Sequence, residues 1–302
     1  MNAVTEEIKQ LKKEKNAVIL AHYYVEDAVQ EIADYIGDSY YLSRLATETT
    51  ADVVVFCGVG FMGESAKVLN PGKKVLMPDM SADCPMAHMA DIAGIEKLRA
   101  EYEDLAVVCY INSTAELKAH ADVCVTSSNA LKIVKALPNK HILFIPDDNL
   151  GHFIAEQVPE KEFLYQNGHC PVHKAIAPEA VKKAKQEHPQ ALVLAHPECL
   201  PEVSALADYV GSTSGIIDYA TKSDAEEFVI CTETGVFYEL KKKNPGKKFY
   251  PASAHQICPD MKKITLEKVR DVLKNESNAV TVEKELSEKS GRPLERMLEL
   301  EK

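Results

Sequence analysis

A threefold internal repeat constrains the fold of this chain more than any other feature. Three stretches read alike: AVILAHYYVEDAVQEIADYIGDS from Ala17, LAVVCYINSTAELKAHADVCVTS from Leu105 and ALVLAHPECLPEVSALADYVGST from Ala191. Each predicts an apolar strand, a polar or aromatic loop, a short helix, an Ala-Asp pair, a second apolar strand and a hydroxyl residue. The Ala-Asp pairs lie 88 and 86 residues apart, and the stretches align without a gap. The chain is therefore expected to contain three copies of one supersecondary unit.

Each copy ends in a Cys-Pro dipeptide. The segments KKVLMPDMSADCP, KEFLYQNGHCP and KKFYPASAHQICP end at Cys84, Cys170 and Cys258, each followed by proline. With 8 cysteines and 15 prolines in 302 residues, chance alone gives about 0.4 such pairs. Proline suits the first turn of a helix, so each cysteine is expected at a strand end or helix start, where the helix dipole favours a thiolate.

Alternating strand and helix patterns place the chain in the α/β class. We expect three homologous three-layer αβα domains with parallel sheets around a pseudo-threefold axis. The expected limits are 1–87, 88–173 and 174–261 for the three repeats, and 262–302 for a C-terminal helical extension in which ERMLELEK forms an amphipathic packing helix.

Composition limits the possible functions. A net charge of −11 argues against nucleic-acid binding, because a phosphate backbone requires a basic face. No apolar run approaches the roughly 20 residues that cross a membrane, so no membrane partner is expected. The N-terminus is a charged amphipathic pattern without the apolar region of a signal peptide, which predicts a cytoplasmic protein. Eight cysteines in a cytoplasmic protein of this size are not expected to form a disulfide framework.

Three sets of aligned polar residues follow the predicted strands. Ligands of open parallel sheets bind beyond the carboxyl ends of the strands, so a threefold arrangement predicts one central cavity lined by these residues and the three cysteines. The sets are His22, Tyr110 and His196; Tyr24, Asn112 and Glu198; and Ser39, Ser127 and Thr213, the last preceded by Gly211 and Ser212.

Three thiolates at one cavity are compatible with a 4Fe–4S cluster that leaves one iron open as a Lewis acid for dehydration. The alternative is a structural zinc site that takes His173 as its fourth ligand. Glu198, His196, His22, Tyr24 and Tyr110 can supply acid and base groups.

The small-residue tracts TSSNA and GSTSG are expected to hold a phosphate or carboxylate, although serine and threonine at such turns are often only helix N-caps. GVGFMGES matches the letters of a dinucleotide loop but lacks the context that such a loop needs, so no dinucleotide role is expected there. Cys57, Cys109, Cys124 and Cys231 lie in apolar runs and are expected in the core. Cys199 is the most plausible spare ligand.

Many short motifs occur here in the order typical of one family. The chain resembles the quinolinate synthase family, which acts second in the de novo synthesis of NAD from aspartate, from about residue 15 to the C-terminus. The motifs are His22-Tyr23-Tyr24, Gly37-Asp38-Ser39, Tyr110-Ile111-Asn112, Thr126-Ser127-Ser128-Asn129-Ala130, Pro146-Asp147, Asn149-Leu150-Gly151, Asn167-Gly168-His169-Cys170-Pro171, His196-Pro197-Glu198-Cys199, Gly211-Ser212-Thr213-Ser214-Gly215 and Cys258-Pro259. Departures from the family pattern are Tyr40, Tyr41 and Cys231, none of which has an expected role.

The resemblance implies a transferase that condenses iminoaspartate with dihydroxyacetone phosphate to quinolinate, with loss of phosphate and two waters. It implies a 4Fe–4S cluster on Cys84, Cys170 and Cys258. It implies Glu198 as general acid/base, with Tyr24 and His196 as proton-transfer or orienting partners.

The remaining implied roles concern substrate binding. Tyr110, also counted among the catalytic groups, and Asn112 would orient the carboxylates of the aspartate-derived substrate. Ser127, Ser212 and Thr213 would contact phosphate or carboxylate, and His22 and Ser39 would complete the pocket. A transient contact with the enzyme that produces iminoaspartate is also expected.

Two other hypotheses remain open from the sequence. One is a different iron–sulfur hydro-lyase on the same scaffold. The other is a non-catalytic three-domain protein with a structural zinc ion, in which the histidine and glutamate residues are ordinary polar strand ends.

Overall fold

The three sequence repeats fold into three parallel sheets of identical topology. The structure, a computed structural model, describes residues 3–301. Each sheet has four strands, and in each the first strand of the repeat pairs with the second and the third. In spatial order the sheets are β2 (Tyr35–Gly37), β1 (Ala17–His22), β3 (Val53–Cys57), β4 (Lys74–Leu76); β6 (Val123–Val125), β5 (Leu105–Tyr110), β7 (His141–Ile145), β8 (Glu162–Leu164); and β10 (Tyr209–Val210), β9 (Leu192–Ala195), β11 (Glu227–Cys231), β12 (Lys248–Pro251).

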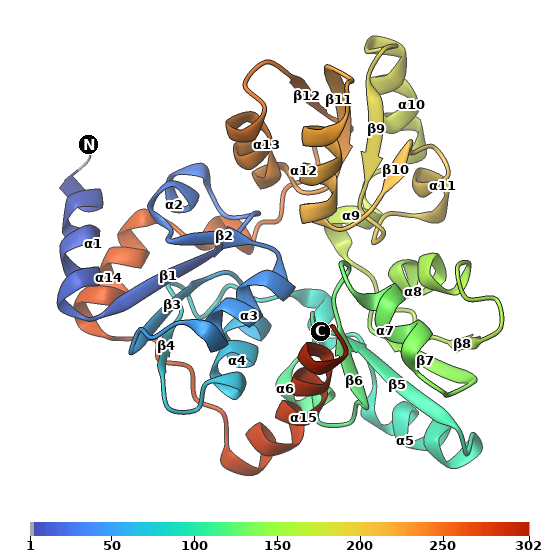
Figure 1. The fold of residues 1–302 in the computed structure, drawn as a ribbon, viewed down its shortest axis with the longest axis horizontal. Helices are drawn as coiled ribbons and strands as arrows, with labels where there is room; N and C mark the ends of the chain where they lie inside the picture. Colours follow the sequence, from blue (N-terminus) through green and yellow to red (C-terminus); the bar gives the residue numbers. More distant parts are fainter. Residues whose placement is uncertain (1–2, 302) are drawn as a thin grey trace.

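Helices flank the sheets, and the three units surround a common centre (Figure 1). The predicted α/β class with three parallel-sheet units is confirmed. We propose that the sheets are the cores of domains 1, 2 and 3, with the limits 1–87, 88–173 and 174–261. The helices are α1 (Ala3–Glu14), α2 (Asp27–Ile32), α3 (Ser39–Glu48), α4 (Gly60–Leu69), α5 (Ile92–Glu101), α6 (Ala115–Lys118), α7 (Ala130–Ala136), α8 (Asp148–Ala155), α9 (Pro171–Lys174), α10 (Pro178–Glu187), α11 (Pro201–Ser204), α12 (Thr213–Lys222), α13 (Phe237–Lys243), α14 (Leu266–Asn275) and α15 (Lys284–Leu300).

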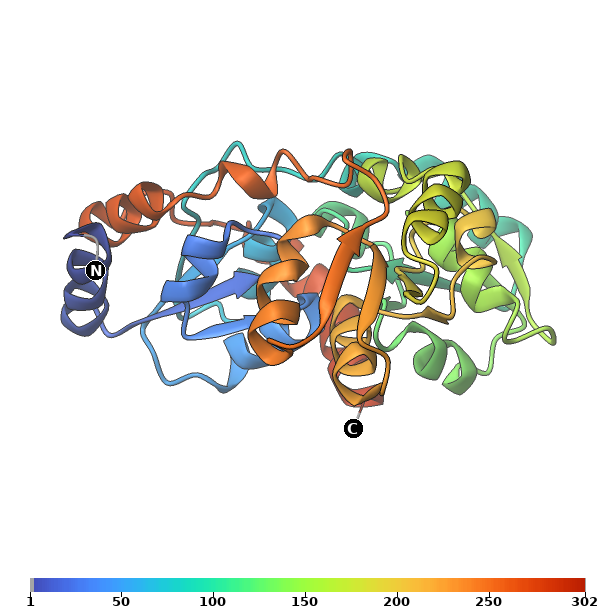
Figure 2. The same ribbon diagram turned by 90° about the horizontal axis from the view of Figure 1, so that it is seen from above.

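The chain closes the ring of domains with its C-terminal segment. After the first two Cys-Pro pairs, a long helix packs on the next sheet along the chain: α5 contacts β5 and α10 contacts β11. The third such helix, α14, returns to the first sheet, where it packs on β3 and lies beside α1, as both views show (Figure 2). The last helix, α15, contacts α4 in domain 1 and both α6 and β6 in domain 2, and its Leu294 and Met297 are fully buried. The C-terminal helix α15 therefore connects domain 1 to domain 2 by packing against both.

The recurrent Ala-Asp pair has a structural role at the start of the second strand of each sheet. The carboxylates of Asp34, Asp122 and Asp208 accept the backbone N–H groups of Ile19, Val107 and Val193 at 2.8, 2.7 and 2.8 Å. The N–H of each aspartate donates in turn to the carbonyl of the same strand residue. The side chain thus completes the hydrogen bonds of the first strand where the second strand begins.

The cysteines of the apolar runs lie in the core. Cys57, Cys109, Cys124 and Cys231 are fully buried in strands, and Cys199 is 1% exposed. Among residues 3–301, no helix has both the length and the apolar composition that a membrane span requires.

Replacement of Asp208 by alanine should destabilise the protein by about 1–3 kcal/mol, because the buried N–H of Val193 would lose its acceptor. Asp208→Asn keeps a side-chain oxygen and should cost less. Urea unfolding of the metal-free protein measures both free energies, and equal losses in the two variants would contradict the assigned hydrogen bond.

Candidate active site

A single cavity lies where the three domains meet, at the carboxyl ends of their first strands. Every residue predicted for the site except Ser212 lines it. These residues are His22, Tyr24, Ser39 and Cys84 from domain 1; Tyr110, Asn112, Ser127 and Cys170 from domain 2; and His196, Glu198, Thr213 and Cys258 from domain 3. Thr126, which belongs to the tract TSSNA, also lines the cavity, as do His173 and Glu233, which were not among the residues predicted for the preferred site.

The three Cys-Pro cysteines differ from the other five because their side chains are partly exposed and line the cavity. Cys84 and Cys170 directly precede short helical turns that begin at Pro85 and Pro171, as predicted, whereas the turn after Cys258 begins at Met261. Burial raises the pKa of all three thiols, that of Cys84 to about 12. Such thiols ionise readily only beside a positive charge. Three free thiols from three domains at one cavity fit a metal cluster with three protein ligands.

His22 and His196 occupy equivalent positions and have the same tautomer. The Nδ1 atom of His22 accepts the backbone N–H of Tyr24 at 3.2 Å, and that of His196 accepts the N–H of Glu198 at 3.3 Å. The proton of each neutral ring is therefore on Nε2, and the Nε2 of His196 lies 3.2 Å from the Ser127 hydroxyl. Burial lowers the pKa of both histidines to about 3, so both are neutral hydrogen-bond donors at physiological pH.

Glu198 is buried at the centre of the cavity and is 3% exposed. One carboxylate oxygen accepts the Tyr110 hydroxyl, and the other lies 2.8 Å from Nδ1 of His173. Burial opposes its ionisation, but the contacts with His173 and Tyr110 hold the pKa of Glu198 below its ordinary value. Glu198 is thus an ionised carboxylate that can accept a proton.

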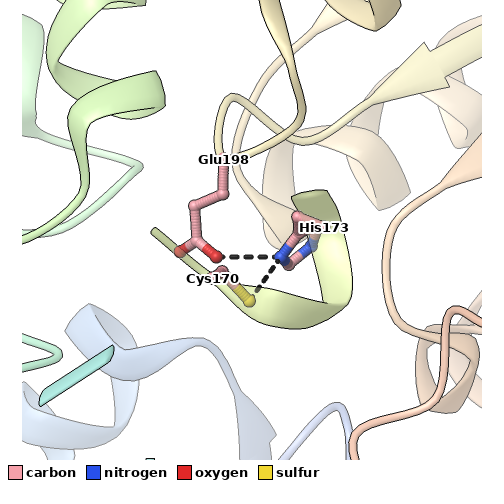
Figure 3. Close-up of side chains that lie close together, drawn as sticks. All are labelled: Cys170, His173 and Glu198. Atoms are coloured by element: carbon pink, nitrogen blue, oxygen red, sulfur yellow. Dashed lines mark hydrogen bonds and ion pairs between the residues drawn. The ribbon is translucent and has the colours of Figure 1, made fainter. Parts of the chain in front are cut away.

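His173 connects Glu198 to one of the cysteines, as Figure 3 shows. Its Nδ1 is also 3.1 Å from Sγ of Cys170, and its Nε2 lies 2.9 Å from the Thr232 hydroxyl. Within residues 3–301, the ligand atoms of Cys170, His173 and Glu198 lie within 4.8 Å of one another. The zinc alternative combined His173 with Cys84, Cys170 and Cys258, but Cys84 and Cys258 do not belong to this close group. The Cys-Pro-Val-His spacing was the sequence signal for His173.

The Tyr24 hydroxyl lies between two threonine hydroxyls, 2.7 Å from Thr213 and 2.8 Å from Thr232. Burial raises the pKa of Tyr24, and the Glu198 charge adds to this effect, so the phenol stays protonated. Burial and Glu198 act in the same way on Tyr110. A continuous series of hydrogen bonds therefore runs from Glu198 through His173 and Thr232 to Tyr24.

The hydroxyl residues divide into two groups. Ser39 and Thr213 are the first residues of α3 and α12 and line the cavity, so two helix N-termini with their free N–H groups point toward it. Such termini bind anions. Ser212 is instead the N-cap of α12, where its Oγ accepts the N–H of Gly215 at 3.1 Å. The structure therefore gives Ser212 a capping role and does not place it among the residues that line the cavity.

Asn112 carries an unsatisfied polar atom. Among residues 3–301, its buried Oδ1 has no hydrogen-bond partner, although the side chain lines the cavity. Buried polar atoms are nearly always paired, so this amide is suited to a polar ligand.

The glycine-rich segment GVGFMGES joins β3 to α4, a strand–turn–helix context that the sequence analysis did not recognise. Its glycines nevertheless make room for side chains. A Cβ at Gly58 would lie 2.6 Å from the sulfur of Met62, and a Cβ at Gly63 would lie 2.1 Å from that of Met77.

Comparisons with known proteins lead to one family. The family profile described as quinolinate synthetase A protein matches residues 6–299. The quinolinate synthase of Caldicellulosiruptor saccharolyticus is 53% identical over 297 residues, which cover 98% of each chain. That of Clostridioides difficile is 54% identical and covers 95% of this chain and 94% of its own. That of Aquifex aeolicus is 51% identical and covers 97% of this chain and 93% of its own.

Acidification should destabilise the metal-free protein through His22 and His196. Their folded pKa of about 3 lies below the ordinary 6.5, so the unfolded chain binds more protons between these pH values and stability falls as the pH falls below 6.5. Between pH 7 and pH 5 the loss should be about 2 kcal/mol for each histidine. Urea unfolding of the wild type and of a His22→Gln, His196→Gln double variant at both pH values would measure it, and an unchanged pH dependence in the double variant would refute the assignment.

Proposed function

We propose a function for this chain from one premise: the chain belongs to the quinolinate synthetase A family. It is an enzyme of that family, and we infer that it condenses iminoaspartate with dihydroxyacetone phosphate to quinolinate, with loss of phosphate and two waters. This reaction is a step in the synthesis of NAD from aspartate. One observation carries the proposal: three thiols from three domains share a single cavity with an ionised glutamate, two neutral histidines and a protonated tyrosine.

Cys84, Cys170 and Cys258 would hold a 4Fe–4S cluster. With only three protein ligands, one iron would stay open and supply Lewis-acid stabilisation to an oxygen of the reacting molecule. The charge of the bound metal would also stabilise the three thiolates, whose pKa burial otherwise raises.

The substrates of this reaction are anionic, and the cavity offers neutral donors rather than lysine or arginine side chains to bind them. Phosphate or carboxylate oxygens would bind at the N-termini of α3 and α12, beside Ser39 and Thr213. The Nε2–H groups of His22 and His196 would donate to carboxylate or carbonyl oxygens. The Asn112 amide, with its unsatisfied oxygen, would pair with a polar group of the aspartate-derived substrate.

Glu198 is the group suited to remove a proton from carbon, because it is ionised and lines the cavity. The phenol of Tyr24 is suited to give a proton to a departing hydroxyl, because it remains protonated. His173 and Thr232 hold these two groups in fixed positions relative to each other. A transient complex with the enzyme that produces iminoaspartate would deliver this unstable substrate.

Protein purified without oxygen should contain about four iron and four acid-labile sulfide per chain, and Cys170→Ser should lose most of both. Metal and sulfide analysis gives this result directly. Stoichiometric zinc without sulfide, even after anaerobic reconstitution, would support the structural-zinc hypothesis and refute the proposal.

Glu198→Gln should retain the cluster but lower quinolinate formation by roughly 10²- to 10⁴-fold, because glutamine cannot accept the proton. Glu202→Gln is the matched control, since Glu202 is exposed on α11, and it should keep full activity. Full activity of Glu198→Gln would remove Glu198 from its role. A wild type that holds the cluster but forms no quinolinate would instead favour a different iron–sulfur hydro-lyase.

A further inference from the structure

Two buried carboxylates bind the backbone of two of the cavity cysteines. Oδ2 of Asp147 accepts the N–H of Cys170 at 3.0 Å, and Oε1 of Glu233 accepts the N–H of Cys258 at 3.1 Å. Both acidic residues have 0% exposure. Asp147 belongs to a motif of the family resemblance, but neither residue was predicted for the site, and neither has a role in the chemistry described above.

These carboxylates occupy equivalent positions in the repeat. Asp147 lies two residues after β7 and Glu233 lies two residues after β11, and they are 86 residues apart. The corresponding residue of domain 1 is Val59, 88 residues before Asp147, which cannot accept a hydrogen bond through its side chain. There the N–H of Cys84 is bound by Oδ1 of the adjacent, exposed Asp83 at 2.8 Å. The backbone N–H of each cavity cysteine is therefore bound to a carboxylate, even where the repeat has lost the equivalent residue.

Helix capping alone does not explain a buried carboxylate at residue 147. Oδ1 of Asp147 caps α8 by accepting the N–H of Leu150 at 2.8 Å, and an exposed aspartate performs the same task for α5, where Asp91 accepts the N–H of Gly94. Within residues 3–301 Asp147 forms no ion pair, so backbone N–H groups alone compensate its charge. Such a position is energetically unfavourable and calls for a function.

The loop before Cys170 is fixed to the Asp147 segment by further contacts. The N–H of Asp148 donates to the carbonyl of Gly168 at 2.9 Å, and a Cβ at Gly168 would lie only 2.1 Å from the carbonyl oxygen of Pro146. Residue 168 must therefore be glycine for the two segments to approach so closely. In domain 3, Glu233 also accepts the N–H of Gly235 at 2.6 Å and pairs with Lys262 at 3.0 Å.

We propose that Asp147 and Glu233 are positioning residues for the metal cluster: each binds the N–H of a ligand cysteine and so holds the thiol toward the cavity before the cluster arrives. The inference rests on the proposed function, because it requires that Cys170 and Cys258 bind the cluster. Partners that orient metal ligands in this way typically contribute 10- to 100-fold to metal affinity.

The test compares cluster retention with fold stability. Asp147→Asn keeps one side-chain oxygen, so it can accept the N–H of Leu150 or that of Cys170 but not both. Glu233→Gln can likewise accept the N–H of Gly235 or that of Cys258 but not both. Each variant is reconstituted with iron and sulfide without oxygen, and the release of iron to a ferrous chelator is followed by absorbance. We expect roughly 10- to 100-fold faster release in both variants.

The control is Asp91→Asn, which changes an N-cap aspartate of the same type that contacts no cysteine. It should release iron at the wild-type rate. Urea unfolding of the cluster-free proteins shows whether a variant merely weakens the fold, and Asp147→Asn should keep a cluster-free stability close to that of Asp91→Asn. If Asp147→Asn does not fold, Glu233→Gln decides the question with the same two measurements.

The outcomes separate this inference from the proposed function. A wild type that binds no cluster would refute the proposed function itself. A wild type that binds the cluster, with variants that release iron at its rate, would overturn only the positioning role. A variant that releases iron faster and whose cluster-free form is destabilised to the same extent would likewise overturn the positioning role. A general weakening of the fold would then explain the faster release.

Discussion

The site depends on one repeated contact, in which the loop after the first strand of each domain meets the segment after the third strand of the preceding domain in the ring. Gly235 packs so closely on Tyr23 that a Cβ would lie 2.6 Å from the Tyr23 carbonyl oxygen. The Asn149 amide donates to the carbonyl of Glu198 at 3.3 Å. Glu64 accepts the first N–H of α6 at 2.9 Å. Parallel strands direct their carboxyl ends to one edge of a sheet, and these three contacts turn that edge of every sheet toward the same centre.

Electrostatics in the cavity follow from its burial. A low dielectric makes a second unpaired charge costly, so His22 and His196 are neutral and the tyrosines stay protonated, while Glu198 keeps its charge through His173 and Tyr110. Neutral donors in fixed positions can stabilise charge that develops during a reaction, because they need little reorganisation. The same burial explains why the cysteine thiols require a bound cation before they become good ligands.

Threefold architecture and asymmetric chemistry coexist because the repeat fixes positions and leaves side chains free to differ. One position supplies Tyr24, Asn112 and Glu198, which are a phenol, an amide and a carboxylate. Another supplies Val59, Asp147 and Glu233, of which only the two acidic residues bind a cysteine N–H. Three copies of a simple unit can thus provide three thiols at one cavity and three different functional groups without any change in fold.

The sequence by itself determined the α/β class, the three units and the residues that converge on the cavity, because hydrophobic periodicity defines strands and the repeat aligns their carboxyl ends. Only the tertiary structure decided which side chains pair there. It placed His173 between Glu198 and Cys170, made Ser212 a helix cap, and returned α14 to the first domain. Hydrogen bonds depend on distances of a few tenths of an ångström between segments far apart in the chain, and such distances are set by packing rather than by the pattern of residues along the sequence.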